Sequence, residues 1–551
     1  MPMTASRGRS AASVSSKLAS RAPSPRWFGF AILILLGTLS SLICTRTARA
    51  QYPFVPPPVP CSERSEGAGI LAGIASTRTA ELPLRNLAVL QFTQLPSTED
   101  PDPALAGLRD RILLRLRRAR PGALREYVGP SELQADAPGE RVLEVKTLGK
   151  QFNARHLLAG RYSQREGIVH VSLEAFDALS GARLWQASRE GPMASLVDLE
   201  PALARSIAAH EFGRLGASDS AALSARETTD GIAYEHYVRG LGALDDTTRL
   251  RQAAAELELA TKRAPKLGVA WSGLAAAYAR NALAPTTDSA ARDSLLVLAV
   301  EAADRAVSLE PRAAYAWVAR GTVLAGGQRL RLARDAFEHA VALQPSNAEA
   351  HRRLGRVLML QGNTSDAQSH LIRSVALAPE EPEPLVDLGE LELNQRAFAQ
   401  SCRALDLALS MNPRLPYAYE LRAMARLHRG QVRPAWIDAE TGRRLGAHLV
   451  GQAVAALVDV AAHDSVAARE HMRALRLREN GKNRISAVEG GYVALGLVAI
   501  GDRAAALDVL DRVRPRDGEL YLMLLRPDFE PLLPDARFQR LLETTRAAVT
   551  R

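Results

Sequence analysis

The chain contains 551 residues, of which 47% are hydrophobic and only 5% are aromatic. This length exceeds a single hydrophobic core, and a sequence rich in Ala and Leu with few aromatic residues favours close-packed helices over a β-sandwich. The formal net charge is +10, but the first 50 residues hold seven basic residues and no acidic one, which leaves 63 basic and 60 acidic residues in the remainder. This near balance gives no electrostatic reason to expect a nucleic-acid partner.

The N-terminal segment has the features of an export signal. Residues 27–44 (WFGFAILILLGTLSSLIC) form an apolar run that follows basic residues, and the small residues Ala48 and Ala50 fit a signal-peptidase site between Ala50 and Gln51. The run is also long enough to span a bilayer, so an uncleaved inner-membrane anchor is the alternative. Both readings predict an extracytoplasmic protein, periplasmic or secreted, that contacts a membrane only through residues 27–44.

A proline-rich linker and few cysteines follow the export signal. Residues 52–60 (YPFVPPPVP) contain five prolines and are expected to be an extended spacer. Only Cys61 and Cys402 lie beyond the predicted cleavage site, without a CxxC motif, which argues against a disulfide framework or a zinc site. Cys402 is expected to be a small buried packing residue.

The region after the linker alternates between strand and helix patterns. Periods of two and of 3.6 residues, together with Gly-containing turns, predict a small α/β domain. The expected strands are Asn86–Phe92, Leu124–Val128, His156–Tyr162, Ile168–Phe176 and Arg183–Ala187, and the expected helices are Pro103–Arg118, Val142–Phe152 and Leu196–Ala209.

Residues 84–212 resemble the N-terminal domain of TolB-like proteins. The resemblance rests on NLAVLQF, on HLLAGRYSQREGIVHVSLEAFDALSGARLW and on the helix that follows. It implies an α/β fold without catalytic residues that precedes tetratricopeptide repeats in many bacterial signalling and regulatory chains. Trp185 is similar to the aromatic residue that follows the hairpin in that family, and we expect it to pack in the core or at the edge of the sheet.

A period of 34 residues dominates the second half of the chain. Prolines recur at this spacing at Pro311, Pro345, Pro379 and Pro413, which is the tetratricopeptide period. Small residues recur with them, because the two helices of each repeat approach closely and each proline ends the second helix. These small residues are Gly321, Gly355 and Gly389 on the first helices and Ala299, Ala333, Ala367, Ser401, Ala306, Ala340, Ser374 and Ala408 on the second.

The 34-residue repeat also predicts which bulky residues lie in the core and where the array is irregular. Trp271, Trp317, Phe337 and Leu371 are expected to be core residues. The step from Pro265 to Pro311 exceeds one repeat by 12 residues, and the excess is expected around residues 284–294. After Pro413 the pattern fades, as is common for terminal repeats, and the apolar tail residues are expected to cap the last helix pair.

The sequence contains no motif of an enzyme active site. It lacks nucleotide-binding, hydrolase, zinc-protease and kinase signatures, and its eleven histidines do not have metal-ligand spacing. We therefore predict no catalytic residue, cofactor or metal site, and no enzymatic activity. The acidic residues Glu390 and Glu392 are expected to lie on a solvated helix face.

The first helices of tetratricopeptide units commonly line a concave groove that binds ligands. Two arginines on one repeat suit an acidic peptide or a C-terminal carboxylate, since guanidinium groups pair bidentately with carboxylates. The candidate groove residues are Tyr315, Glu349, Arg352, Arg356, Glu390, Asn394, Tyr417, Glu420 and His428.

The predicted fold class is mainly α, a tetratricopeptide helix-pair solenoid preceded by a small α/β domain. The predicted function is a non-catalytic protein–protein interaction scaffold or adaptor in the bacterial cell envelope, with a protein or peptide partner. The alternative is a signalling or regulatory module that works with a kinase, cyclase or transcription regulator. The predicted segments are a signal or anchor (1–50), a linker (51–82), the TolB-like domain (83–212), repeats (230–446), degenerate helix pairs (447–526) and a cap (527–551).

Cell fractionation with mass spectrometry of the native N-terminus tests the export prediction. We expect a periplasmic or secreted chain that begins at Gln51. A membrane-bound chain that retains residues 27–44 supports the anchor instead, and a cytoplasmic chain contradicts both readings.

Overall fold

A computed structural model describes residues 85–95, 102–119, 133, 138–152, 154–244, 246–284, 287, 289–379, 381–446, 450–479, 487–513 and 518–550. The predicted signal, the linker and the strand expected at Leu124–Val128 lie outside these residues. Within them, no helix is both long and apolar enough to cross a membrane.

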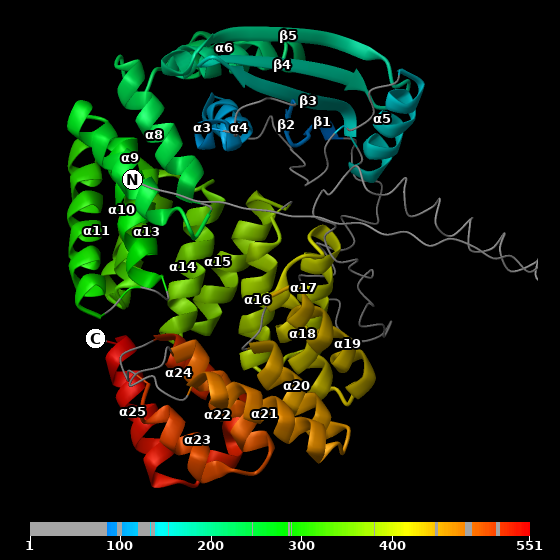
Figure 1. Cartoon of the computed structure of the whole chain (residues 1–551), viewed down its shortest axis with the longest axis vertical. Helices are drawn as coiled ribbons and strands as arrows, with labels where there is room; N and C mark the ends of the chain where they lie inside the picture. Colours follow the sequence, from blue (N-terminus) through cyan, green and yellow to red (C-terminus); the bar gives the residue numbers. More distant parts are fainter. Residues whose placement is uncertain are drawn as a thin grey trace, which may run out of the picture. The chain divides into compact units, whose positions relative to one another are not determined.

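A five-stranded sheet forms the N-terminal domain (Figure 1). Its strand order is β1-β3-β4-β5, and the short β2 also pairs with β3. β1 and β2 run parallel to β3, whereas β3, β4 and β5 form an antiparallel meander. The strands are β1 (Arg85–Val89), β2 (Thr93–Gln94), β3 (Ala154–Arg165), β4 (Ile168–Asp177) and β5 (Arg183–Pro192).

Strand alternation gives this sheet two different faces. Val169, Val171 and Leu173 of β4 belong to a buried cluster with residues of α3, α4 and α6, whereas Phe176 packs with Leu148 of α5 on the other face. The helix expected at residues 103–118 is two helices, because Gly107 ends the first one. The helices of this region are α3 (Pro103–Ala106), α4 (Leu108–Ala119), α5 (Pro138–Phe152), η1 (Met193–Ser195), α6 (Leu196–Glu211) and α7 (Ala217–Ser224).

From Gly231 onward the described elements are all helices, and consecutive helices pack against each other as pairs (Figure 1). The elements are α8 (Gly231–Leu244), α9 (Leu250–Arg263), α10 (Gly268–Leu283), α11 (Ser289–Leu309), α12 (Ala314–Gly326), α13 (Leu330–Leu343), α14 (Ala348–Leu360), α15 (Thr364–Leu377), α16 (Glu383–Asn394), α17 (Phe398–Met411), α18 (Pro416–His428), α19 (Val432–Arg444), α20 (Val450–Ala461), α21 (Ser465–Glu479), α22 (Ala487–Ala499), α23 (Arg503–Leu510), α24 (Gly518–Leu524), η2 (Pro527–Leu532) and α25 (Ala536–Thr550). The predicted helix-pair solenoid after a small α/β region is confirmed.

The helices of each pair cross where one of them carries a glycine. A methyl group added at Gly321 would lie 2.6 Å from Phe337, and one added at Gly389 would lie 2.7 Å from Leu405. The large residue of the second helix therefore occupies the space that the glycine leaves. The expected core residue Phe337 is fully buried.

Bulky residues on three first helices tie each helix to the turn before it. The indole nitrogens of Trp271 and Trp317 donate to the carbonyls of Pro265 and Pro311 at 3.0 and 2.9 Å. His351 occupies the equivalent position and lies 3.2 Å from the carbonyl of Pro345. Both tryptophans are partly buried and pack against core clusters, so they lie at the edge of the core rather than inside it.

The first repeat and the α/β domain share a core. Tyr234 and Val238 of α8 belong to the same buried cluster as the sheet residues. The buried Glu200 of α6 accepts hydrogen bonds from Arg111 of α4 and from the hydroxyl of Tyr234. The α/β domain therefore covers the N-terminal end of the helix array.

The excess of residues before Pro311 lies around residues 284–294, as expected, and most of it is helical. α10 ends at Leu283 and α11 begins at Ser289, so the connection is short. α11 has 21 residues, against 14 in the equivalent helix α13. A longer second helix takes up most of the insertion.

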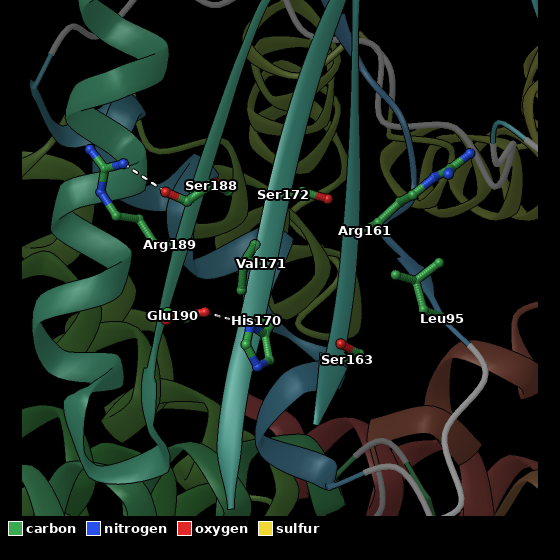
Figure 2. Close-up of a pocket in the computed structure, with 9 residues that line it drawn as sticks. All are labelled: Leu95, Arg161, Ser163, His170, Val171, Ser172, Ser188, Arg189 and Glu190. Carbon is green, nitrogen blue, oxygen red and sulfur yellow. Dashed lines mark hydrogen bonds and ion pairs between the residues drawn. The ribbon is translucent and has the colours of Figure 1, made fainter. Parts of the chain in front are cut away.

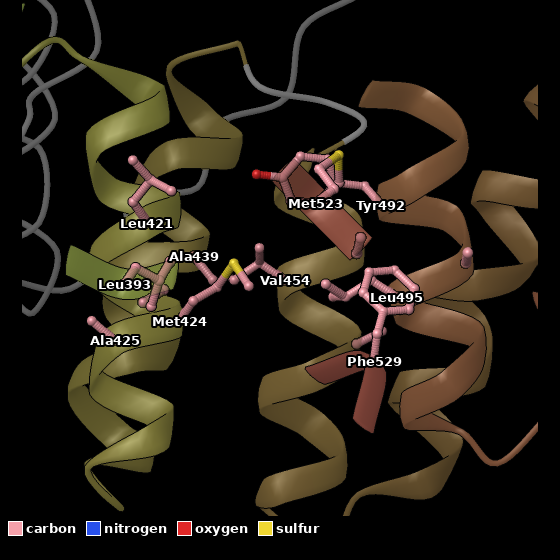
Figure 3. Packing of buried hydrophobic residues seen from close by; sticks show 14 of the residues in the cluster. Leu393, Leu421, Met424, Ala425, Ala439, Val454, Tyr492, Leu495, Met523 and Phe529 are labelled. Atoms are coloured by element: carbon pink, nitrogen blue, oxygen red, sulfur yellow. The ribbon is translucent and has the colours of Figure 1, made fainter. Parts of the chain in front are cut away.

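The C-terminal pairs pack around the largest buried cluster. Figure 3 shows Met424 of α18 and Val454 of α20 close together, with Leu495 of α22 beside Phe529 of η2. The tail residues Phe529 and Phe538 are almost fully buried, and their rings stack with centroids 6.0 Å apart.

The turns between first and second helices repeat a left-handed backbone position. Gln328, Gly362, Arg396 and Gly430 follow each other at 34-residue spacing with φ between 61° and 78°, and His463 has φ 63° in the next turn. Side chains are disfavoured in this conformation because Cβ approaches the following carbonyl oxygen. Glycine fits it best.

Substitutions at two of these turns test this constraint. His463→Gly should raise the free energy of unfolding by about 1 kcal/mol, and Gly430→Ala should lower it by a similar amount. Gly430 has no atom within 4 Å of an added Cβ, so its substitution reports backbone strain rather than a clash. Urea unfolding of both variants measures the effect, and a destabilised His463→Gly chain contradicts the assignment.

Candidate protein-binding surface

The predicted groove residues lie on the first helices α12, α14, α16 and α18, a set of positions called the first-helix surface below. Tyr315 of α12 stands apart from the others. It is half-buried and packs against Leu267 and Val269 of the preceding repeat.

Arg352 and Arg356 of α14 join this helix to α16. Arg352 lies 3.1 Å and Arg356 lies 2.9 Å from the carboxylate of Asp387. Arg352 also donates to Glu349, at 2.9 Å. Burial acts to raise the pKa of Glu349, but the neighbouring guanidinium groups of Arg353 and Arg352 outweigh it and lower that pKa. The two arginines therefore already hold carboxylates.

Glu390 of α16 lies at the centre of a buried polar cluster. Its carboxylate accepts a hydrogen bond from the hydroxyl of Tyr417 at 2.7 Å and lies 3.3 Å from Arg356 and 3.4 Å from Arg526. The expectation that Glu390 and Glu392 are solvated is wrong, because both are at most 3% exposed. Burial raises the pKa of Glu392 to about 8.

The C-terminal segment Gly518–Glu530 lies against the first-helix surface. Glu519 of α24 pairs with Arg356 at 2.8 Å, and the Gly518 amide donates to the side-chain oxygen of Gln328 at 2.8 Å. Asp528 lies 3.1 Å from His428, and Glu530 pairs with Arg396. The tail therefore does more than cover the last pair, which sequence reasoning missed.

Arg526 anchors this segment. Its guanidinium is 1% exposed, donates to the hydroxyl of Tyr492 at 3.0 Å, and lies 5.2 Å from the centroid of the Tyr492 ring. It also approaches the sulfur of Met424 at 3.6 Å. The sequence signal for this residue was an arginine between an apolar run and Pro527, in LMLLRPDF.

Glu420, Asn394 and His428 lie around this cluster. Glu420 is 1% exposed, and burial raises its pKa to about 9, although Arg526 acts to lower it. Neither the Asn394 amide nor Oε1 of Glu420 has a hydrogen-bond partner among the described residues. The His428 ring stacks on Phe398 with centroids 4.5 Å apart.

A hollow lies on the sheet of the α/β domain (Figure 2). It has a volume of about 430 Å³, and its lining residues include Arg161, Ser163, His170 and Ser172. Strand register places Ser163 opposite His170 and Arg161 opposite Ser172, and His170 lies 2.9 Å from Glu190. The arrangement suits a polar ligand. In the described part of the chain, no group of three or more His, Cys, Asp or Glu side chains could hold a metal ion.

Comparison with known proteins agrees with the helix-pair architecture. Residues 324–383 match the family model of a tetratricopeptide repeat, so the chain carries repeats of this class. None of the curated proteins compared matches the sequence. The resemblance of residues 84–212 to the TolB-like domain stays a prediction.

Several solved structures are similar to part of this chain. PilF of Pseudomonas aeruginosa is 18% identical, with 40% of this chain and 94% of that chain covered and a TM-score of 0.33. PilW, a type IV pilus biogenesis factor, is 17% identical, with 38% and 95% covered and a TM-score of 0.33. A thermophilic tetratricopeptide repeat protein of Thermus thermophilus is 21% identical, with 35% and 99% covered and a TM-score of 0.31.

The buried Glu420 predicts a pH dependence of stability. Its folded pKa lies above the unfolded value of about 4.3, so unfolding releases its proton and the stability of the chain falls as pH rises from about 4.3 to 9. Glu420→Gln has no proton to release. The variant should exceed the wild type in unfolding free energy by at least about 2 kcal/mol near pH 8, and this difference should shrink near pH 4.

Glu440→Gln is the matched control, measured by urea unfolding at both pH values. Hydrogen bonds from Arg443 and Arg444 lower the pKa of Glu440, with the bond from Arg443 the larger cause. Its ionised form therefore stabilises the fold above the unfolded pKa, and this contribution is lost as pH falls. Glu440→Gln should weaken the fold near pH 8, opposite in sign to Glu420→Gln. Parallel profiles for Glu420→Gln and the wild type contradict the assignment.

Proposed function

We propose that the chain is a non-catalytic protein–protein interaction scaffold of the bacterial cell envelope, which binds partner peptides along the first-helix surface. Tetratricopeptide repeats in residues 324–383 support the general role of binding proteins. The proposed site extends from α12 to α18 and includes the candidate residues named above.

One observation carries this proposal. The first-helix surface holds a polypeptide segment, its own residues 518–530, through side chains from several repeats. Arg356 of α14 holds Glu519, Glu390 of α16 faces Arg526, and His428 of α18 holds Asp528. Cationic and anionic groups alternate along this surface, which suits a segment that carries both signs of charge.

The charged clusters elsewhere support a structural rather than a catalytic role. Asp438 accepts hydrogen bonds from Arg422 and Arg426 at 2.6 Å each, and all three residues are at most 1% exposed. Glu200 is equally enclosed by Arg111 and Tyr234. A general acid or base must reach a substrate proton, whereas the Asp438 and Glu200 carboxylates are buried and hydrogen-bonded to neighbouring side chains.

The location in the envelope rests on the N-terminal sequence. The apolar run at residues 27–44 and the small residues before Gln51 support export of everything that follows. If the run stays uncleaved, it is the membrane contact of an anchored scaffold. The partner is a protein or peptide in the same compartment.

Site-specific photo-crosslinking in cells tests the proposal. A photoreactive phenylalanine analogue replaces Tyr315, an aromatic residue of α12 that packs against the preceding repeat. The matched control is Trp436, which is 51% exposed on the second helix α19. We expect partner adducts from position 315 and none from position 436. Adducts only from position 436, or none from position 315, contradict the proposed surface.

A further inference from the structure

We propose that α24, Gly518–Leu524, is an internal ligand of the first-helix surface, and that a partner binds by placing a similar segment there. This inference rests on the proposed function for its biological meaning. The partner segment that we expect is a short apolar helix with a carboxylate near its start and an aromatic residue two positions later. The chain's own version is GELYLML.

The carboxylate position is defined by Arg356. This arginine lies on α14, and α24 lies against that helix (Figure 1). Its guanidinium reaches Glu519 at 2.8 Å as well as Asp387 and Glu390 of α16. Glu519 is 163 residues away in sequence, and its side chain keeps 28% exposure. The ion pair is therefore open to solvent on one side, where a competing carboxylate can approach.

The apolar positions are defined by side chains of the middle repeats. Tyr521 and Leu522 of α24 belong to a buried cluster with Leu324, Leu330 and Leu360. Tyr521 also lies 3.9 Å from the position that a Cβ would take at Gly362. The opposite face of α24 contributes Leu520, Met523 and Leu524 to the cluster of the last pairs. The middle repeats thus recognise one face of α24, in the manner of a helix docked in a groove.

One turn of the array supports this recognition. Gln328 keeps φ 61° at a position where Gly362 and Gly430 are found in the following repeats. Its side-chain oxygen accepts a hydrogen bond from the Gly518 amide, the first residue of α24. A side chain is disfavoured in this backbone conformation, so Gln328 bears a cost that glycine avoids and makes a contact with α24 that glycine cannot make.

The part of the tail that a partner segment can replace ends before Arg526. This arginine is enclosed by Glu390, Tyr492 and Met424, and Phe529 and Leu532 after it are at most 1% exposed. α24 has only seven residues, too few to be stable as an isolated helix. The helical form of α24 therefore depends on its contacts with the surface, and the segment is expected to unfold when a partner segment takes its place.

Fluorescence polarisation with the full chain tests the inference. The probe is a labelled peptide of residues 518–525, GELYLMLL. In the wild type, α24 competes with the probe. Glu519→Arg sets two guanidinium groups against each other and should raise the affinity for the probe roughly tenfold.

Arg537→Ala is the matched control for damage to the tail. It removes the ion pairs of α25 with Asp508 of α23 and with Asp511, the residue that follows α23. These contacts lie away from the first-helix surface, so probe binding should stay at the wild-type level. Hydrogen exchange gives a second measurement that does not depend on a variant folding. In the wild-type chain, the amides of α24 should exchange faster than those of α22. Equal protection of the two helices overturns the inference.

The remaining outcomes separate the two proposals. If Glu519→Arg binds the probe no better than the wild type while position 315 still crosslinks a partner, the surface binds proteins but α24 is a fixed part of the fold. If Glu519→Arg binds the probe but position 315 crosslinks nothing, α24 is exchangeable and the scaffold proposal fails. If Glu519→Arg forms a dimer that excludes the probe, a second copy of the chain is the occupant, which overturns a foreign partner.

Discussion

The close crossing of the two helices in each repeat is the contact on which the rest of the structure depends. Gly321, Gly355 and Gly389 leave no room for a side chain of their own, because Phe337, Leu371 and Leu405 already fill that space. This spacing fixes how far each first helix stands from its partner. Successive first helices therefore place equivalent residues at regular intervals, as at Arg356, Glu390 and Met424, which are 34 residues apart in sequence.

Regular spacing explains why one extended segment can contact several repeats at once. Gln328, Arg356, Glu390 and His428 come from four successive units and all contact the stretch from Gly518 to Asp528. At the other end of the array, α8 is shared with the core of the α/β domain through Tyr234 and Val238. Both ends of the repeat array are thus covered by other parts of the chain. The array cannot be shortened at either end without exposing apolar residues to water.

The sequence predicted the helix pairs because proline and small residues carry a local, periodic signal, and the groove positions followed from that frame. It did not predict the burial of Glu390, because this depends on Arg526, which is 136 residues away and belongs to a tail without the repeat pattern. Gln328 and Arg396 were missed for the same reason. At Gln328 and Arg396, a side chain that is disfavoured in this backbone conformation contacts the tail, so a residue other than glycine at this turn position is a usable signal.

The buried charges and the apolar residues act differently on the position of α24. The apolar contacts of Tyr521 and Leu522 hold α24 on the surface but do not fix its position along it. A helix shifted by one turn would still place a leucine against the same cluster. A buried ion pair adds little net stability, since desolvation offsets attraction, yet a single unpaired partner is costly. Glu519 at Arg356 and Arg526 at Glu390 are satisfied together in one register only. The two ion pairs therefore select the position of α24, and a partner segment that satisfies Arg356 is held to the same register.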